Sequence, residues 1–147
     1  MVFDIEELDD GVKNIIFETV ELSRLAVSDY YCYKVGVILV DEQGNKFRGV
    51  NFEPSNGKTT CAESGVISAY LLSDRKPVKA LFLYGSSTKN AKKEDTFGLP
   101  CGACRQMLYD FISPDTVIYG INETVTKVRT VLLEELLPYS FSTKNLE

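Results

Sequence analysis

Apolar residues first recur with helical spacing and then gather into strand-like runs. Between residues 10 and 27 they return every three or four positions, which predicts an amphipathic packing helix, and Asp9 or Asp10 can cap its start. A run rich in β-branched residues follows at 35–40, then a cluster of turn-forming residues and a second extended segment at 46–52. These two extended segments predict a β-hairpin.

The rest of the chain alternates between the same two patterns. Helical spacing marks some segments, short apolar runs mark others, and Pro138 ends the last of them. The expected segments are, in order, a helix at 61–73, a strand at 78–84, an irregular polar stretch at 85–99, a helix at about 102–112, strands at 117–119 and 125–128, and a helix at 131–137.

This order of helices and strands predicts the fold class. Helices interspersed with strands imply a mixed sheet covered on both faces, a three-layer α/β/α sandwich with five strands. At 147 residues the chain fits one domain spanning residues 1–147, long enough to bury a substantial core.

Composition and charge narrow the range of partners. Hydrophobic residues make up 44% and charged residues 25%, which is ordinary for a soluble globular protein. The net charge of −5, with no basic cluster beyond Lys92-Lys93, leaves no electrostatic footprint for a nucleic acid polymer. The acidic start has no signal-peptide pattern and no apolar run approaches membrane-spanning length. We therefore expect a cytoplasmic protein with no membrane partner.

Histidine and cysteine content limit the chemistry. The chain has no histidine, which excludes Ser-His-Asp and Cys-His catalysis, so any metal must rest on sulfur and carboxylate ligands. Three of the four cysteines lie in two short segments with ligand-like spacing, which suits a reducing compartment. The fourth, Cys32, lies in an aromatic run, and we expect it to be a small semi-buried residue that takes no part in metal binding.

The three clustered cysteines predict a metal site. Cys101 and Cys104 form a Cys-x-x-Cys pair, which can hold two corners of a zinc tetrahedron, although such a pair alone also occurs in redox sites and structural zinc knuckles. Cys61 would complete a set of three ligands and leave the fourth position for water, the pattern of a catalytic zinc site. Glu63, two residues later in the first turn of an expected helix, can carry the proton of that water.

Together these segments resemble the small cytidine deaminase family. The resemblance rests on Cys-Ala-Glu at 61–63 and on Pro-Cys-Gly-Ala-Cys-Arg-Gln at 100–106. It implies the same three-layer fold over most of the chain, Zn²⁺ held by Cys61, Cys101 and Cys104, and Glu63 as the proton carrier in the hydrolytic deamination of a nucleoside. It also implies that Ala62 contacts the substrate.

Other residues fit the same resemblance. Asn51 and Glu53 match the pair that binds the sugar hydroxyls in the family, and Tyr33 matches the aromatic residue that packs against the base. Phe141, at the end of a Glu-Leu-Leu-Pro-x-x-Phe segment, matches the aromatic residue that covers the base in a neighbouring subunit, which implies a homotetramer with shared active sites. Arg105 matches an arginine that draws negative charge off the zinc-bound sulfurs.

Departures from the family pattern leave the substrate open. The chain has Pro54-Ser55 where cytidine-binding members continue with Asn-Ala, and Ser64 where an arginine is common. Our leading interpretation is deamination of cytidine and deoxycytidine in pyrimidine salvage. The alternatives are deamination of another aminated nucleoside such as blasticidin S, or a non-catalytic, zinc-stabilised binding protein.

Overall fold

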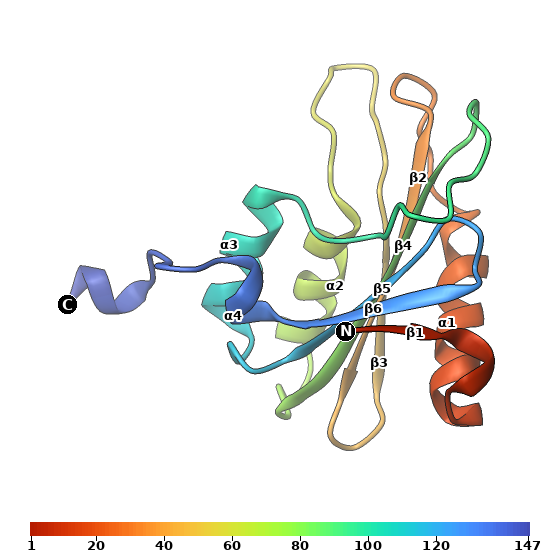
Figure 1. Ribbon diagram of the computed structural model, residues 1–147. Coiled ribbons are helices and arrows are strands. Elements are labelled where there is room, and N and C mark those ends of the chain that lie inside the picture. Colours follow the sequence, from red (N-terminus) through yellow and green to blue (C-terminus); the bar gives the residue numbers. More distant parts are fainter.

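Six strands form one mixed sheet, in the order β1-β6-β5-β4-β2-β3, in the computed structural model, which describes residues 1–147 (Figure 1). β4 and β5 pair in parallel, and every other neighbouring pair is antiparallel. The strands are β1 (Val2–Asp4), β2 (Tyr33–Asp41), β3 (Lys46–Val50), β4 (Val78–Ser87), β5 (Val117–Ile121) and β6 (Lys127–Leu132).

Helices cover both faces of this sheet. Figure 1 shows α1 on one face and α2 and α3 on the other, which confirms the three-layer α/β class. The helices are α1 (Asp10–Ser23), α2 (Ala62–Leu71), α3 (Gly102–Phe111) and α4 (Leu133–Leu136), and short 3-10 helices lie at Ile5–Glu7 and Thr143–Leu146. None of them combines the length and the apolar character needed to span a bilayer.

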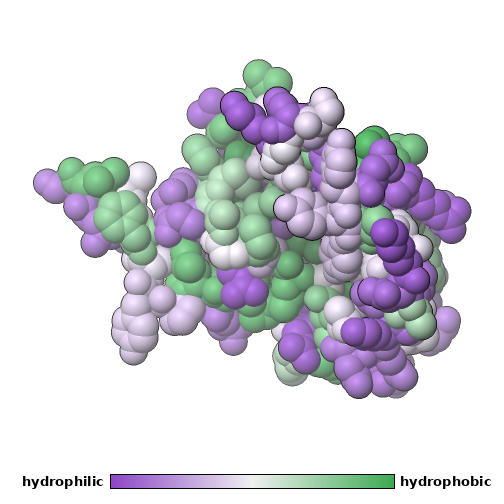
Figure 2. All heavy atoms as spheres, turned by 90° about the horizontal axis from the view of Figure 1, so that it is seen from above, coloured by the Kyte–Doolittle hydropathy of each residue, from purple (hydrophilic) through white to green (hydrophobic).

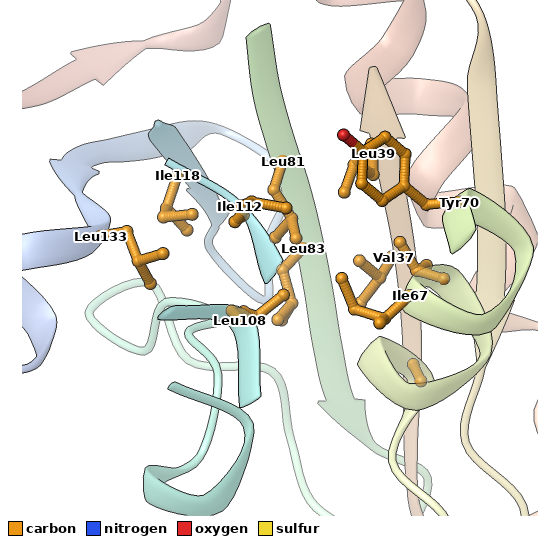
Figure 3. Close-up of a cluster of buried hydrophobic side chains, with 12 residues drawn as sticks. Val37, Leu39, Ile67, Tyr70, Leu81, Leu83, Leu108, Ile112, Ile118 and Leu133 are labelled. Carbon is orange, nitrogen blue, oxygen red and sulfur yellow. The ribbon is translucent and has the colours of Figure 1, made fainter. Parts of the chain in front are cut away.

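The core has two halves, one on each face of the sheet. Because successive side chains of a strand point to opposite faces, Val37 and Leu39 of β2 pack toward α2, whereas Ile38 packs into the cluster that contains Ile16 of α1. Figure 3 shows the α2 and α3 side, with Leu81 of β4 between the side chains of β2 and α2 and those of α3 and β5. The continuous apolar runs of β2 and β4 reflect burial on both faces.

The first helix begins as expected and ends early. The side chain of Asp9 accepts a hydrogen bond from the backbone N–H of Val12 at 3.1 Å, so Asp9 is the cap. The helix stops at Ser23, whose hydroxyl donates to the carbonyl of Val20. Val27, which extends the apolar pattern, instead forms an isolated bridge with Phe52 beside the sheet.

Two expectations for the sheet and its edge need correction. The sheet has six strands where five were expected, because Val2–Asp4 adds an edge strand to β6. The predicted helix at 131–137 is shortened to α4, since Val131 and Leu132 belong to β6 and pair with β5. An apolar run alone does not separate a strand end from a helix start, and here pairing with β5 decides it.

Three loops gather at one end of the sheet, around the start of α2 and α3 (Figure 1). The first loop lies between α1 and β2, the second between β3 and α2, and the third between β4 and α3. The C-terminal segment takes a different course and stands away from the body, carrying apolar atoms of its own (Figure 1, Figure 2). The loops, together with the helix starts between them, hold the predicted chemistry.

Candidate metal centre and substrate pocket

Two helix N-termini bring three cysteine sulfurs together. Cys61 is the N-cap of α2, Cys101 is the N-cap of α3, and Cys104 lies in the first turn of α3. The three sulfurs lie within 4.8 Å of one another. Zn–S bonds of about 2.3 Å in a tetrahedron place sulfurs about 3.8 Å apart, so this donor set fits a zinc ion. Cys32 is outside the cluster, with its sulfur near the carbonyls of Asp29 and Tyr30.

The protonation of these thiols also fits a cation. Burial raises the pKa of Cys104, and the negative charge of Glu63 raises it further. Burial likewise raises the pKa of Cys61. At Cys101 burial acts in the same direction, but hydrogen bonds from the backbone amide of Cys104 and from the other two cysteines outweigh it and lower the pKa. Burial thus opposes ionisation of Cys61 and Cys104, and a divalent cation would offset the repulsion among three thiolates.

Glu63 lies in the first turn of α2 and is 4% exposed. Burial raises the pKa of its carboxyl, and hydrogen bonds from its own amide and from Cys104 only partly oppose this shift. A carboxyl whose pKa is moved toward neutrality can both accept and donate a proton near physiological pH. It has the properties required of a proton carrier.

A cavity of about 280 Å³ opens beside the cysteines. Cys61, Cys101 and Glu63 form one part of its wall, and the other predicted substrate contacts complete it: Tyr33, Asn51, Glu53 and Ala62. The structure thus brings together, in one pocket, seven of the residues that the sequence singled out, contributed by β2, the loop after β3 and the starts of α2 and α3.

Asn51 and Glu53 are held firmly at the end of β3. The side-chain oxygen of Asn51 accepts from the backbone N–H of Val35, and its nitrogen donates to the carbonyl of Tyr33, both at 2.8 Å. For Glu53, burial acts to raise the pKa, but hydrogen bonds from the hydroxyl of Ser28 and two backbone amides outweigh it, so the pKa is lowered. Glu53 is therefore a buried carboxylate at neutral pH.

The aromatic wall depends on a glycine. The ring of Tyr33 lies against Gly85 of β4, and a Cβ at that position would come within 2.7 Å of the ring. Burial raises the pKa of Tyr33, and the charges of Glu123 and Tyr84 add to the shift. Tyr33 therefore presents a neutral, closely packed ring to the cavity.

Besides Cys104, which is buried behind the cavity wall, two predicted residues lie outside the cavity. The guanidinium of Arg105 donates to the carbonyls of Pro100 at 2.8 Å and Leu136 at 3.2 Å, and it makes no hydrogen bond to a sulfur, so its effect on the thiolates stays a prediction. Phe141 is 56% exposed on the C-terminal segment, where its carbonyl accepts from Gln106. Within one chain Phe141 does not reach the pocket.

Sequence reasoning missed several residues of the cavity wall. Phe97 and Leu99 line it, and the guanidinium of Arg129 lies over the Phe97 ring at 4.6 Å from the centroid. The sequence could have indicated Phe97 and Leu99, because they lie just before Pro100 and Cys101, and residues next to a metal ligand in the chain lie near the same site. Tyr31 also lines the cavity, and its neighbourhood of aromatic residues gave no such signal.

Comparisons with known proteins point to one family. Residues 13–121 match the family described as the cytidine and deoxycytidylate deaminase zinc-binding region. The chain is 30% identical over 138 residues to a cytidine deaminase of Sporosarcina psychrophila, covering 92% of this chain and 94% of that protein. It is 27% identical over 133 residues to a cytidine deaminase of Halalkalibacterium halodurans, covering 90% and 95%.

A solved structure of a cytidine deaminase has a similar fold. The crystal structure of cytidine deaminase from Burkholderia pseudomallei superimposes with a TM-score of 0.74 at 26% identity, covering 91% of this chain and all of that one.

Proposed function

The chain belongs to the family of cytidine and deoxycytidylate deaminases, and from that membership we propose that it is a zinc-dependent hydrolase of cytidine and deoxycytidine. The reaction adds one water to the substrate and yields uridine or deoxyuridine and ammonia. The observation that carries this proposal is a cluster of three cysteine sulfurs beside a cavity whose wall includes two of those cysteines and a buried glutamate.

The metal would be held by Cys61, Cys101 and Cys104. When bound there, zinc supplies a Lewis acid that makes water a stronger nucleophile near neutral pH. The chain's own residues then do the remaining work. Glu63, which lines the same cavity, takes up the two protons of the attacking water one after the other. It delivers the first to the ring nitrogen as the C–O bond forms, and the second to the amino group, which leaves as ammonia as the carbonyl forms. Its raised pKa suits both directions of transfer.

Recognition of a nucleoside is supported by the hydrogen-bonding positions that remain free. Asn51 has a second N–H on its amide nitrogen, and the Glu53 carboxylate, which accepts three hydrogen bonds, has room for a fourth. A sugar hydroxyl would donate a hydrogen bond to the Glu53 carboxylate and accept one from the Asn51 amide nitrogen. Tyr33 and Ala62 supply apolar surface for the base.

A homotetramer with shared active sites is the quaternary structure that we propose. The support is that Phe141 and Tyr139 are exposed near the end of the chain, and that the C-terminal segment stands away from the body (Figure 1, Figure 2). Phe141 would cover the base in a neighbouring subunit. We further propose one domain for residues 1–147, because both halves of the core pack on the same sheet. We also propose a cytoplasmic location, because none of the four cysteines forms a disulfide, which suits a reducing compartment.

Turnover followed by ultraviolet absorbance tests the function. The purified zinc-loaded protein should convert cytidine and deoxycytidine, whereas cytosine, which lacks the sugar, should react poorly. Blasticidin S serves as a further arm. Conversion of blasticidin S without conversion of either nucleoside would overturn the proposal, as would zinc-loaded protein that turns over none of the four compounds.

A further inference from the structure

A buried hydroxyl links the two walls of the pocket. Ser28, in the loop before β2, is 4% exposed and lies next to the end of β3. Its hydroxyl donates to Oε1 of Glu53 at 2.5 Å and accepts from the backbone N–H of Tyr33 at 3.0 Å. Because the Tyr33 amide can only donate and the ionised Glu53 carboxylate can only accept, the single hydroxyl proton is directed at Glu53. The carboxylate and the aromatic wall are therefore joined through one atom.

The other partners of Glu53 leave one of its oxygens dependent on Ser28. The backbone amides of Tyr30 and Tyr31 both donate to Oε2, at 2.8 and 3.2 Å. Oε1 has Ser28 as its only hydrogen-bond donor, and no other side chain donates to this carboxylate. Without the hydroxyl the carboxylate could swing about Oε2. The oxygen that keeps a free position for the substrate is the one that Ser28 holds.

The surrounding backbone makes this a fixed arrangement. The amide of Val27 donates to the carbonyl of Asn51, and the amide of Glu53 donates to the carbonyl of Val27. From the other side, the carbonyl of Cys32 accepts from Thr88 at the end of β4. The loop that carries Ser28 is thus hydrogen-bonded to the Asn51–Glu53 segment and to the end of the central strand β4. The position of the Ser28 side chain relative to Glu53 is therefore fixed by the backbone.

We propose that Ser28 is a positioning residue, which fixes Oε1 of Glu53 for a sugar hydroxyl of the nucleoside and couples that carboxylate to the Tyr33 wall. This inference rests on the proposed function, and specifically on sugar binding by Glu53. The interaction with a sugar hydroxyl is made in both the bound substrate and the transition state. Its loss should therefore raise KM and leave kcat nearly unchanged.

Substrates with and without the relevant hydroxyls separate this role from a general loss of structure. In Ser28→Ala, KM for cytidine should rise about tenfold with kcat within about twofold, the factor expected for one lost hydrogen bond to a charged group. For 2′,3′-dideoxycytidine, kcat/KM should change by less than about twofold relative to wild type. Ser28→Thr, which keeps the hydroxyl, should restore most of the cytidine KM.

Control variants complete the design. Ser23→Ala removes another buried serine hydroxyl, one that donates only to a helix carbonyl. It should leave the KM for cytidine and the KM for 2′,3′-dideoxycytidine unchanged. In a Glu53→Gln background, Ser28→Ala should raise the KM for cytidine by less than about twofold more, since both substitutions remove the same contact with the sugar. If Ser28→Ala does not fold, Ser28→Cys can replace it, because cysteine keeps the side-chain volume and has only a weak hydrogen-bond donor. Ser28→Cys should also raise the KM for cytidine and leave that for 2′,3′-dideoxycytidine unchanged.

Each contrary outcome has a distinct meaning. A wild-type protein that deaminates no nucleoside overturns this proposal together with the proposed function. Turnover of cytidine with an unchanged KM in Glu53→Gln overturns the sugar role of Glu53, and Ser28 with it. A KM rise in Glu53→Gln without one in Ser28→Ala, or an equal rise for cytidine and the dideoxy compound in Ser28→Ala, overturns the role of Ser28 alone.

Discussion

Replacing Gly49 by alanine should displace the helix that carries Cys61 and Glu63. A Cβ on Gly49 of β3 would come within 2.2 Å of the Ala62 carbonyl oxygen and 2.9 Å of a Val66 methyl. Contacts under 3.0 Å essentially do not occur for a Cβ, and the nearest obstacle is backbone, so α2 must move from β3 by about 0.8 Å. The first turn of α2, which positions Glu63, moves with it.

The expected effects are a loss of both stability and turnover. Overpacking of this kind costs about 1–3 kcal/mol, which lowers Tm by about 2–12 °C for a chain of this size. A displacement near 1 Å of a reacting group can reduce the rate about 100-fold. Thermal unfolding of the zinc-loaded protein and steady-state turnover on cytidine measure the two effects.

A second glycine provides the matched control. Gly65, on α2 itself, would place its Cβ 3.7 Å from the Cα of Gly49, an ordinary contact. Gly65→Ala should therefore stabilise the helix by about 0.5–1 kcal/mol and keep turnover. Equal Tm and equal turnover in Gly49→Ala and wild type would refute the close approach of α2 to β3, and a loss of activity in Gly65→Ala as large as that in Gly49→Ala would show that the contact is not specific.

Three further results are expected. Glu63→Gln should retain zinc, as measured by elemental analysis, and lose about 10²–10⁴ in turnover, since it removes the proton carrier; near-normal turnover would exclude that role. At Asp41, burial acts to raise the pKa, but hydrogen bonds from Asn45 and neighbouring amides outweigh it and lower the pKa, so this carboxylate stabilises the fold above its unfolded pKa and less as pH falls. Asp41→Asn should accordingly lower Tm at pH 7, and the gap to wild type should narrow as the pH falls below about 4 and toward the lowered folded pKa. A gap that stays constant as the pH is lowered would contradict this. Phe141→Ala should raise the cytidine KM about tenfold, and sedimentation should show a tetramer for wild type, whereas a fully active monomer would contradict the shared site.

The layers of the fold were predictable because burial leaves a direct record in the sequence. The strands β2 and β4 are apolar on both faces since helices cover both sides, and the predicted runs at 35–40 and 78–84 lie inside them but stop short of their polar ends. The edge strand β1 left no such record, because its three residues Val2–Asp4 are mostly exposed and end on an acid. Its pairing with β6, far along the chain, is what defines it as a strand.

The site was predictable where chemistry demands particular residues. Three cysteines in ligand-like spacing and a glutamate two positions after the first can be read from the sequence. The fold brings the three sulfurs together, and Cys61, Cys101 and Glu63 line one cavity. The support for the site was not predictable. Ser28 is 25 residues from Glu53, and a single serine in a loop carries no signal that its hydroxyl will meet a buried carboxylate.

The zinc content of cysteine variants tests the central claim most directly. Elemental analysis of wild type and Cys32→Ser should each give about one zinc per chain, because Cys32 lies outside the cluster of three sulfurs. Cys101→Ala should lose most of its zinc, since it keeps only two of three ligands. Full zinc retention in Cys101→Ala, or loss of zinc in Cys32→Ser, would contradict a metal centre built from Cys61, Cys101 and Cys104.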